Sequence, residues 1–341
     1  MLKSQLRKDL SIKILEDPLE ILNYLQIGIS IPILPEFKKY IINDLKFFKA
    51  KSILLLEDGN PIGNSLIFRS TNEVLNFGYF GVLNHNESKI SLLIDYLINY
   101  AKENKFKMIH GPFNIPGIIF GWGFMKEGSL ENLFIGKPVN PPIYQNSFLK
   151  KKFNVIHEII TWEGSLPRIN PWKMKQYDFS DYEFFYPSDF DDFLKYKSDF
   201  LRLQADNLPL SARLIPNNTG AIDNYAKFIY EFGENFYLFF VRYKPTKKIV
   251  ACGACLPNIF RKNINNFYDS IVYFTWAVDP KHRRKGITIL MFGAVSLLLW
   301  KKKVRYSSGP VAKDNLANTR VAMKLGAAKG RTHLILEYKV V

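Results

Sequence analysis

The sequence has few of the residues that build reactive centres on their own. Its 341 residues include two cysteines and five histidines. Two cysteines cannot form a disulfide framework, and their scarcity is typical of a reducing compartment, so we expect a cytoplasmic protein. The histidines have no spacing typical of metal ligands, and no Ser-His-Asp or paired-carboxylate pattern stands out. We therefore expect neither a metal centre nor a covalent nucleophile.

Long apolar runs are also missing. The most hydrophobic stretch, residues 287–300, lies between the basic stretches 282–285 and 301–303. It is shorter than the roughly 20 residues that cross a bilayer. The charged N-terminus is followed by no apolar segment, which argues against a signal peptide. The sequence thus predicts a buried helix at 287–300 and no membrane span.

Acidic residues are in deficit. Lys and Arg number 47 against 31 Asp and Glu, which gives a formal net charge of +16. Such a field favours polyanionic partners, among them nucleic acid, an acidic carrier protein, a membrane surface or a phosphorylated cofactor. A solvated lysine-rich surface is the simplest explanation of the charge taken alone. The length and a hydrophobic share of 47% are typical of a globular chain with two domains.

The order of elements in the second half predicts a mixed sheet of the α/β (α+β) class. The pattern predicts strands at 236–242, 249–256 and 268–278, a helix at 286–303, a short strand at 304–308 stopped by Gly309-Pro310, a helix at 315–325 and a strand at 332–340.

The first half repeats this order, with strands at 53–56, 62–68 and 74–83, a helix at 87–105, a strand at 106–110, a helix at 143–152 and a strand at 153–162. His110-Gly111-Pro112 stands where Ser308-Gly309-Pro310 stands in the second half. Matching order and spacing indicate an internal duplication. We expect a first domain at 1–165, a linker at 166–175 and a second domain at 176–341.

The segment Val278-Asp279-Pro280-Lys281-His282-Arg283-Arg284-Lys285-Gly286-Ile287-Thr288 is the most informative. A strand leads into a basic loop, a glycine and a long apolar helix. The start of a helix offers unpaired N–H groups and a partial positive charge, and Gly286 lets a ligand approach the backbone. This combination predicts a pyrophosphate site. The alternative is a basic turn that ends in a capping glycine.

Val278-x-Pro280-x-x-Arg283-x-x-Gly286-Ile287 resembles the acyl-CoA-binding motif of the GNAT superfamily of N-acyltransferases, and the stretch from Asn315 to Gly326 resembles that family's next helix. The resemblance implies a GNAT-like fold, acetyl-CoA or another acyl-CoA as co-substrate, and the amine of a small molecule or peptide as acceptor. It places the cofactor on Ala277, Val278, Arg283, Arg284, Lys285, Gly286, Ile287, Thr288 and Asn315.

Several positions depart from the family pattern. Thr288 stands where the family prefers glycine or alanine, and Ala322 stands where many members carry a tyrosine acid. The strand at 271–278 holds no glutamate base. Alternation along that strand places Tyr273 and Thr275 on one face, where they are candidates for a proton relay through water or, alternatively, packing residues. Alternation also places Cys252 and Cys255 on opposite faces.

The first half resembles a GNAT domain without its cofactor loop, because residues 82–89 contain neither glycine nor arginine. Gly111-Pro112-Phe113-Asn114 and Asn140-Pro141-Pro142-Ile143-Tyr144 resemble motifs of uncharacterised bacterial and archaeal tandem GNAT proteins. Trp122, Asn140 and Tyr144 are candidates to line an acceptor pocket between the domains. The alternative for these three is a packed loop shaped by glycine and proline.

Two other functions fit the same residues. Tandem GNAT-like folds also resemble transferases whose donor is aminoacyl-tRNA or an acyl-carrier protein, and the charge of +16 suits either donor. Without a tyrosine acid or a strand glutamate, the chain also fits a module that binds acyl-CoA without turning it over. The intact Arg283-Arg284-Lys285-Gly286 loop favours coenzyme A as the donor.

Overall fold

A computed structural model describes residues 9–129, 133–167, 171–207, 219–261 and 268–340. Packing groups the chain into two compact units. Unit 1 comprises residues 1–127, 136–158 and 333–341, and unit 2 comprises 128–135 and 159–332. The sequence predicts two consecutive domains, one on either side of a linker at 166–175. The two units are not consecutive in the sequence, because each of them includes a segment from the other half of the chain.

Unit 1 is built on an antiparallel meander that ends in one parallel strand. The strands β1 (Leu10–Leu15), β2 (Lys51–Glu57), β3 (Asn60–Arg69) and β4 (Val74–Val82) are antiparallel neighbours in that order. β5 (Met108–Gly111) is parallel to β4, and its other side pairs with residues 336–339 of β13 (Ala328–Lys339). The unit also contains β6 (Phe124–Glu127), the start of β7 (Asn154–Ser165), α1 (Pro18–Leu22), α2 (Lys38–Phe47), α3 (Glu87–Glu103), α4 (Gly117–Phe120) and α5 (Pro142–Lys150).

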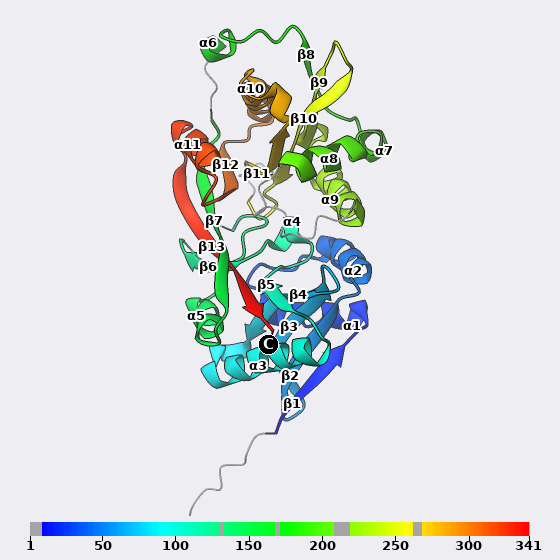
Figure 1. Ribbon diagram of the computed structural model, residues 1–341, viewed down its shortest axis with the longest axis vertical. Coiled ribbons are helices and arrows are strands. Elements are labelled where there is room, and N and C mark those ends of the chain that lie inside the picture. Colours follow the sequence, from blue (N-terminus) through cyan, green and yellow to red (C-terminus); the bar gives the residue numbers. More distant parts are fainter. Residues whose placement is uncertain (1–8, 130–132, 168–170, 208–218, 262–267, 341) are drawn as a thin grey trace, which may run out of the picture. The chain divides into compact units, whose positions relative to one another are not determined.

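The core of unit 1 forms where α3 and α5 pack on the sheet (Figure 1). α3 buries a stripe of apolar side chains spaced three and four residues apart, from Ile90 to Ala101. Phe148 of α5 lies at the centre of an aromatic cluster. Its ring centroid lies 4.8 Å from those of Phe77, Phe80 and Phe153.

We predict that Phe148→Ala lowers the free energy of unfolding by about 3–5 kcal/mol, because it leaves a cavity among these rings. Leu149→Ala is the matched control, since the neighbouring Leu149 side chain is 37% exposed, and it should change stability by less than about 1 kcal/mol. Denaturant titration of both variants measures the difference. Equal losses for the two variants would contradict the assignment of Phe148 to the core.

Unit 2 repeats the architecture. The strands β8 (Tyr182–Phe185), β9 (Leu238–Tyr243), β10 (Lys248–Pro257) and β11 (Ser270–Val278) are antiparallel neighbours, and β12 (Tyr306–Ala312) is parallel to β11. The far side of β12 pairs with residues 159–165 of β7. The helices are α6 (Pro171–Met174), α7 (Phe190–Leu194), α8 (Lys197–Asn207), α9 (Thr219–Phe232), α10 (Ile287–Lys301) and α11 (Leu316–Lys324). Within the described residues, no helix is long and apolar enough to span a membrane.

The expected duplication is confirmed by the strand pairing. β4 and β5 are parallel over three residue pairs that end at Asn76 and His110. β11 and β12 are parallel over three pairs that end at Val272 and Ser308. His110 and Ser308 therefore occupy the same place in the two units. The Gly-Pro pair that follows each of them predicted this equivalence.

One strand is longer than expected. β12 does not stop at Gly309-Pro310 but continues to Ala312, paired with β7. A proline in a strand removes a ladder hydrogen bond and is tolerated where one side of the strand is free. β11 has already separated from β12 at this point, so that side of Pro310 faces no partner strand.

Candidate functional site

The two parallel strands of unit 2 separate after a short common stretch. Their pairing ends at Val272 and Ser308, although β11 continues to Val278 and β12 to Ala312. We call the space between residues 273–278 and 309–312 the wedge. The outer side of each strand remains paired, β11 with β10 and β12 with β7. Among the described residues, no strand pairs with the inner sides of residues 273–278 and 309–312.

A β-bulge marks the place where β11 turns away. Ala254 of β10 pairs with Thr275, but the next residue, Cys255, pairs with Tyr273. Phe274 is thus the extra residue. A bulge bends its strand and increases the local twist, which is the physical reason why β11 cannot follow β12 further.

In unit 1 the corresponding space is filled by the chain itself. The Phe113 N–H donates to the Phe77 carbonyl at 2.7 Å, and the Asn114 Oδ1 accepts from the Tyr79 N–H at 2.7 Å. Gly78 permits this approach, because a Cβ there would lie 1.9 Å from the Phe113 carbonyl oxygen. In unit 2 the equivalent residues, 311 and 312, stay in β12 and pair with β7, so they do not cover β11.

We predict that Asn114→Ala lowers the free energy of unfolding by about 1–3 kcal/mol, because the buried Tyr79 N–H loses its acceptor. Hydrogen exchange at the Tyr79 amide should become faster in the same variant. Asn104→Ala removes an exposed amide at the end of α3 and should leave both readouts close to wild type. An Asn114 variant with unchanged exchange at Tyr79 would contradict this account of how unit 1 is closed.

The basic loop follows β11 and leads into α10. The Asp279 N–H donates to the Val250 carbonyl at 2.8 Å, and the Arg283 Nε donates to the Val278 carbonyl at 3.1 Å. Gly286 caps α10 at φ 79°, in the left-handed region that favours glycine. The side chains of the predicted cofactor residues Arg283, Arg284, Lys285 and Thr288 are exposed, whereas Ile287 is buried. The loop therefore presents three cations beside the unpaired N–H groups of a helix start.

Aromatic residues far away in the sequence hold this loop. The Tyr182 hydroxyl lies 3.0 Å from Nδ1 of His282, and the Tyr243 ring lies 4.9 Å from the His282 ring. Burial and the nearby Lys285 cation lower the pKa of His282, which favours the neutral form of its ring. The Tyr177 ring packs directly on Gly286, where a Cβ would lie 2.5 Å from the Tyr177 Cγ. Sequence reasoning missed these contacts because they join separate segments, about 100 residues apart for Tyr177 and Tyr182 and about 40 for Tyr243.

The remaining predicted cofactor residues lie at the edges of the wedge. Ala277 and Val278 close β11 and pair with Cys252 and Ala251 of β10. Asn315 begins the helix that follows β12, and its side chain accepts a hydrogen bond from the Asn318 N–H at 3.2 Å. Both ends of the wedge thus lead into the start of a helix, α10 after β11 and α11 after β12.

The sheet of unit 2 has helices on both faces. The Phe240 ring packs against Phe200 of α8, with ring centroids 6.2 Å apart. The adjacent Phe239 packs on the other face against Trp276, which stacks on Phe292 of α10 at 4.2 Å. In Figure 1, α8 and α9 lie on one side of β10 and α10 lies on the other.

The two predicted catalytic candidates lie on different faces. The Thr275 Oγ1 donates to Oε1 of Gln204 in α8 at 2.5 Å. The Tyr273 ring instead contacts Phe292 of α10 at 5.4 Å, and burial raises the pKa of its hydroxyl. The expectation that they share a face is therefore wrong, because the bulge at Phe274 interrupts the alternation. They cannot form one proton relay.

The predicted acceptor residues all lie in unit 1, where each takes part in packing. The Tyr144 hydroxyl accepts from the Val82 N–H at 3.0 Å and lies 2.8 Å from Nδ1 of His85. The Asn140 Oδ1 accepts from a backbone N–H at 2.6 Å. Trp122 is 9% exposed and bridges to the strand segment after β5. These contacts favour the packed-loop interpretation, and Tyr144 closes the end of β4 where unit 2 has its basic loop.

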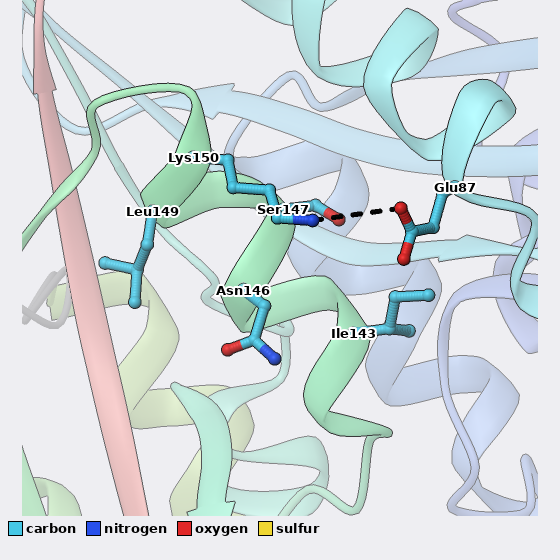
Figure 2. Close-up of a pocket in the computed structure, with 6 residues that line it drawn as sticks. All are labelled: Glu87, Ile143, Asn146, Ser147, Leu149 and Lys150. Atoms are coloured by element: carbon cyan, nitrogen blue, oxygen red, sulfur yellow. Dashed lines mark ion pairs between the residues drawn. The ribbon is translucent and has the colours of Figure 1, made fainter.

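A groove in unit 1 lies between α5 and the first turn of α3 (Figure 2). Lys150 and Glu87 face each other across it, with Nζ and Oε2 3.8 Å apart. The other lining residues are Ile143, Asn146, Ser147 and Leu149. Both side chains of this ion pair are exposed, so the groove holds no desolvated acid–base group and does not compete with the wedge as the candidate site.

Both cysteines are buried thiols in β10. Cys252 faces α8, with its Sγ 3.5 Å from the Gln204 Nε2, whereas Cys255 lies near Tyr273 and raises the pKa of that hydroxyl. The prediction of opposite faces is thus confirmed. Among the described residues, no group of three or more His, Cys, Asp or Glu side chains could hold a metal ion.

Burial raises the pKa of the Cys252 thiol to about 12 and raises that of Cys255 as well. A raised pKa means less thiolate at any given pH, so we predict that the folded chain resists alkylation by iodoacetamide up to about pH 9, whereas the unfolded chain, with ordinary thiols near pKa 8.5, reacts at once. Mass spectrometry after labelling checks this. Rapid modification of either cysteine in the folded chain would show that it is accessible.

Comparison with known proteins is informative at the level of the fold. No protein-family model and no curated protein sequence matches the chain. Among solved structures, a tandem GNAT protein from the clavulanic acid biosynthesis pathway matches 98% of this chain with 99% of its own, at 12% identity and a TM-score of 0.63. A GCN5-related N-acetyltransferase from Sphaerobacter thermophilus matches over 96% of both chains, at 8% identity and a TM-score of 0.57.

A third solved structure contains this fold within a longer protein. The glucosamine N-acetyltransferase region of a fungal multi-domain β-N-acetylglucosaminidase matches 98% of this chain and 38% of its own, at 14% identity and a TM-score of 0.65. The chain has the GNAT fold in its tandem form. The resemblance of residues 278–287 to the GNAT motif predicted this fold correctly.

Proposed function

We propose that the chain is an N-acyltransferase whose second unit binds acetyl-CoA or another acyl-CoA and transfers the acyl group to the amine of a small molecule or peptide. The observation that carries the proposal is the difference between the two units. The strand edge after the three-residue parallel pairing is covered by Phe113 and Asn114 in unit 1. In unit 2 no described residue pairs across the wedge, which ends at a basic helix start.

The residues around the wedge fit the parts of coenzyme A. The helix start at 286–288 and the cations of Arg283, Arg284 and Lys285 suit a pyrophosphate. The pantetheine arm contains two amides, and these can pair with the inner edge of β11 as an added strand would. The arm would run from the pyrophosphate beyond Val278 back along β11, so the thioester, which supplies the activated acyl group, would lie deeper in the wedge, toward Ser308.

The chemistry needs no covalent enzyme intermediate. A neutral amine attacks the thioester carbonyl directly, and the protein holds the two reactants together. A backbone N–H on the inner side of β11 would polarise the carbonyl oxygen as negative charge develops on it. The buried, protonated cysteines are consistent with direct attack because they are unsuited to act as nucleophiles.

Isothermal titration with coenzyme A tests the proposal. We predict one binding site per chain, because among the described residues the strand edge after the parallel pairing is covered in unit 1 and uncovered in unit 2. Arg284→Ala should weaken binding about tenfold to a hundredfold, since a charge-assisted hydrogen bond contributes roughly 1.5–3 kcal/mol. Lys301→Ala, which removes an exposed cation from the other end of α10, should leave the affinity unchanged.

Two outcomes would end this proposal. Equal affinities for wild type and Arg284→Ala would show that the loop does not hold the pyrophosphate, and two sites per chain would show that unit 1 also binds. Release of free thiol from acetyl-CoA over a panel of amines then separates a transferase from a module that only binds. Binding of tRNA or an acyl-carrier protein in place of coenzyme A would favour a different donor, one that the charge of +16 also suits.

A further inference from the structure

We propose that Glu163 takes the proton from the acceptor amine and that Ser308 and Thr161 bind the same amine by hydrogen bonds. The proposal deepens the function given above and rests on it. It supplies the base that the strand at 271–278 lacks, and it places that base on β7, a strand from the first half of the sequence.

The strand register places these side chains beside the wedge. Ser308 of β12 pairs with Glu163 of β7, and it is also the last residue of β12 that pairs with β11. Directly paired residues present their side chains on the same face, with Cβ atoms about 4.5–5.5 Å apart. Glu163 is thus one strand away from the point where the wedge opens.

The same register identifies the face. Ser308 also pairs with Val272, and Thr275 lies on the face of Val272 because the bulge at Phe274 adds one residue between them. Thr275 bonds to Gln204 of α8, so Ser308 and Glu163 lie on the α8 face. The α10 face carries Tyr273, which lies against Gly309. The amine would therefore approach the wedge from the face opposite the helix that begins at the basic loop.

Two hydroxyl groups on this face lack hydrogen-bond partners. Ser308 is 1% exposed and Thr161 is 0% exposed, and neither hydroxyl oxygen has a hydrogen-bond partner among the residues that the structure describes. Thr161 is two residues from Glu163 on β7 and therefore shares its face. Buried hydroxyls are nearly always paired in native proteins, so an unpaired couple beside an open strand edge indicates a ligand that donates hydrogen bonds. A protonated primary amine is such a ligand.

Glu163 has the charge and the access that this role needs. Its Oε1 lies 4.0 Å from Nη1 of Arg331 in β13, and the Glu163 side chain is 24% exposed while that of Arg331 is only 2% exposed. The guanidinium thus lies on the buried side of Glu163. A partly exposed carboxylate beside two hydroxyl groups can bind an ammonium group and then accept its proton.

The reaction balances with these groups. The ammonium R–NH3+ gives one proton to the Glu163 carboxylate, and the resulting R–NH2 forms a C–N bond to the thioester carbonyl. The C–S bond breaks, and the coenzyme leaves as a thiolate that takes up the second proton from the nitrogen. Glu163 returns its proton to water, so acyl-CoA and R–NH3+ give the amide, coenzyme A and one proton.

Unit 1 provides a matched control. Glu337 pairs in register with His110, as Glu163 does with Ser308, and the His110 Nε2 lies 2.9 Å from the Glu337 Oε2. The nearby strand edge in unit 1 is covered by Phe113 and Asn114. Glu337→Gln therefore alters the equivalent carboxylate in a unit without an open wedge, and we expect wild-type turnover from it.

The test compares two amines at neutral pH. Propylamine arrives protonated and needs the base, whereas hydroxylamine arrives neutral and does not. Release of free thiol from acetyl-CoA gives kcat/KM for each amine, and coenzyme A titration and thermal unfolding show that the variants still fold and bind. For Glu163→Gln we expect kcat/KM with propylamine to fall about 10²-fold while that with hydroxylamine stays near wild type. Ser308→Ala should raise KM for propylamine and leave the affinity for coenzyme A unchanged.

Three results would overturn this assignment. Wild-type turnover of propylamine by Glu163→Gln would show that the carboxylate takes no proton. Equal losses with both amines would show a structural role. Wild-type protein that binds coenzyme A but acylates neither amine would refute the proposed transferase, and this inference with it, whereas normal wild-type turnover with either of the first two results would refute this inference alone.

Discussion

The architecture of unit 2 depends on the separation of two parallel strands after only three residue pairs. β11 is held by β10 on one side and bent by the bulge at Phe274, while β12 is held by β7. Neither strand can close the gap without giving up a ladder of hydrogen bonds on its other side. The separation therefore persists as a backbone edge inside the sheet, and the loop of residues 279–286 and the start of α11 both lie where these strands end.

The same constraint in unit 1 has a different solution. After Gly111-Pro112 the chain leaves β5 and lies against β4, where Asn114 bonds to Tyr79, and Tyr144 bonds to the end of β4 at Val82. The opening is thus closed by backbone and side chains of the same unit. A ligand that pairs with a strand would have to displace these buried hydrogen bonds. The duplication therefore yields one unit with an available edge and one in which that edge is part of the core.

Local sequence patterns predict the order of the elements and the cofactor loop. They do not predict features that depend on how distant strands pair. The cofactor loop could be predicted because strand, cations, glycine and helix follow one another from Val278 to Thr288. The relation between Tyr273 and Thr275 could not, because a bulge depends on how β10 pairs with β11. Tyr177 and Tyr182 lie about 100 residues from the loop that they support. The end of a strand also depends on its partner strands. β12 continues through Pro310 to Ala312 because β7 pairs with it there.

The exchange of closing strands has the largest consequence for function. By chain order β7 ends the first repeat and β13 ends the second, yet residues 159–165 pair with β12 and residues 336–339 pair with β5. Each repeat thus supplies a glutamate to the other unit at the same register position, Glu163 opposite Ser308 and Glu337 opposite His110. In unit 1 the imidazole of His110 engages the carboxylate directly. In unit 2 the Ser308 hydroxyl has no hydrogen-bond partner among the described residues. The same register position therefore holds a His–Glu contact in unit 1 and the proposed amine site in unit 2.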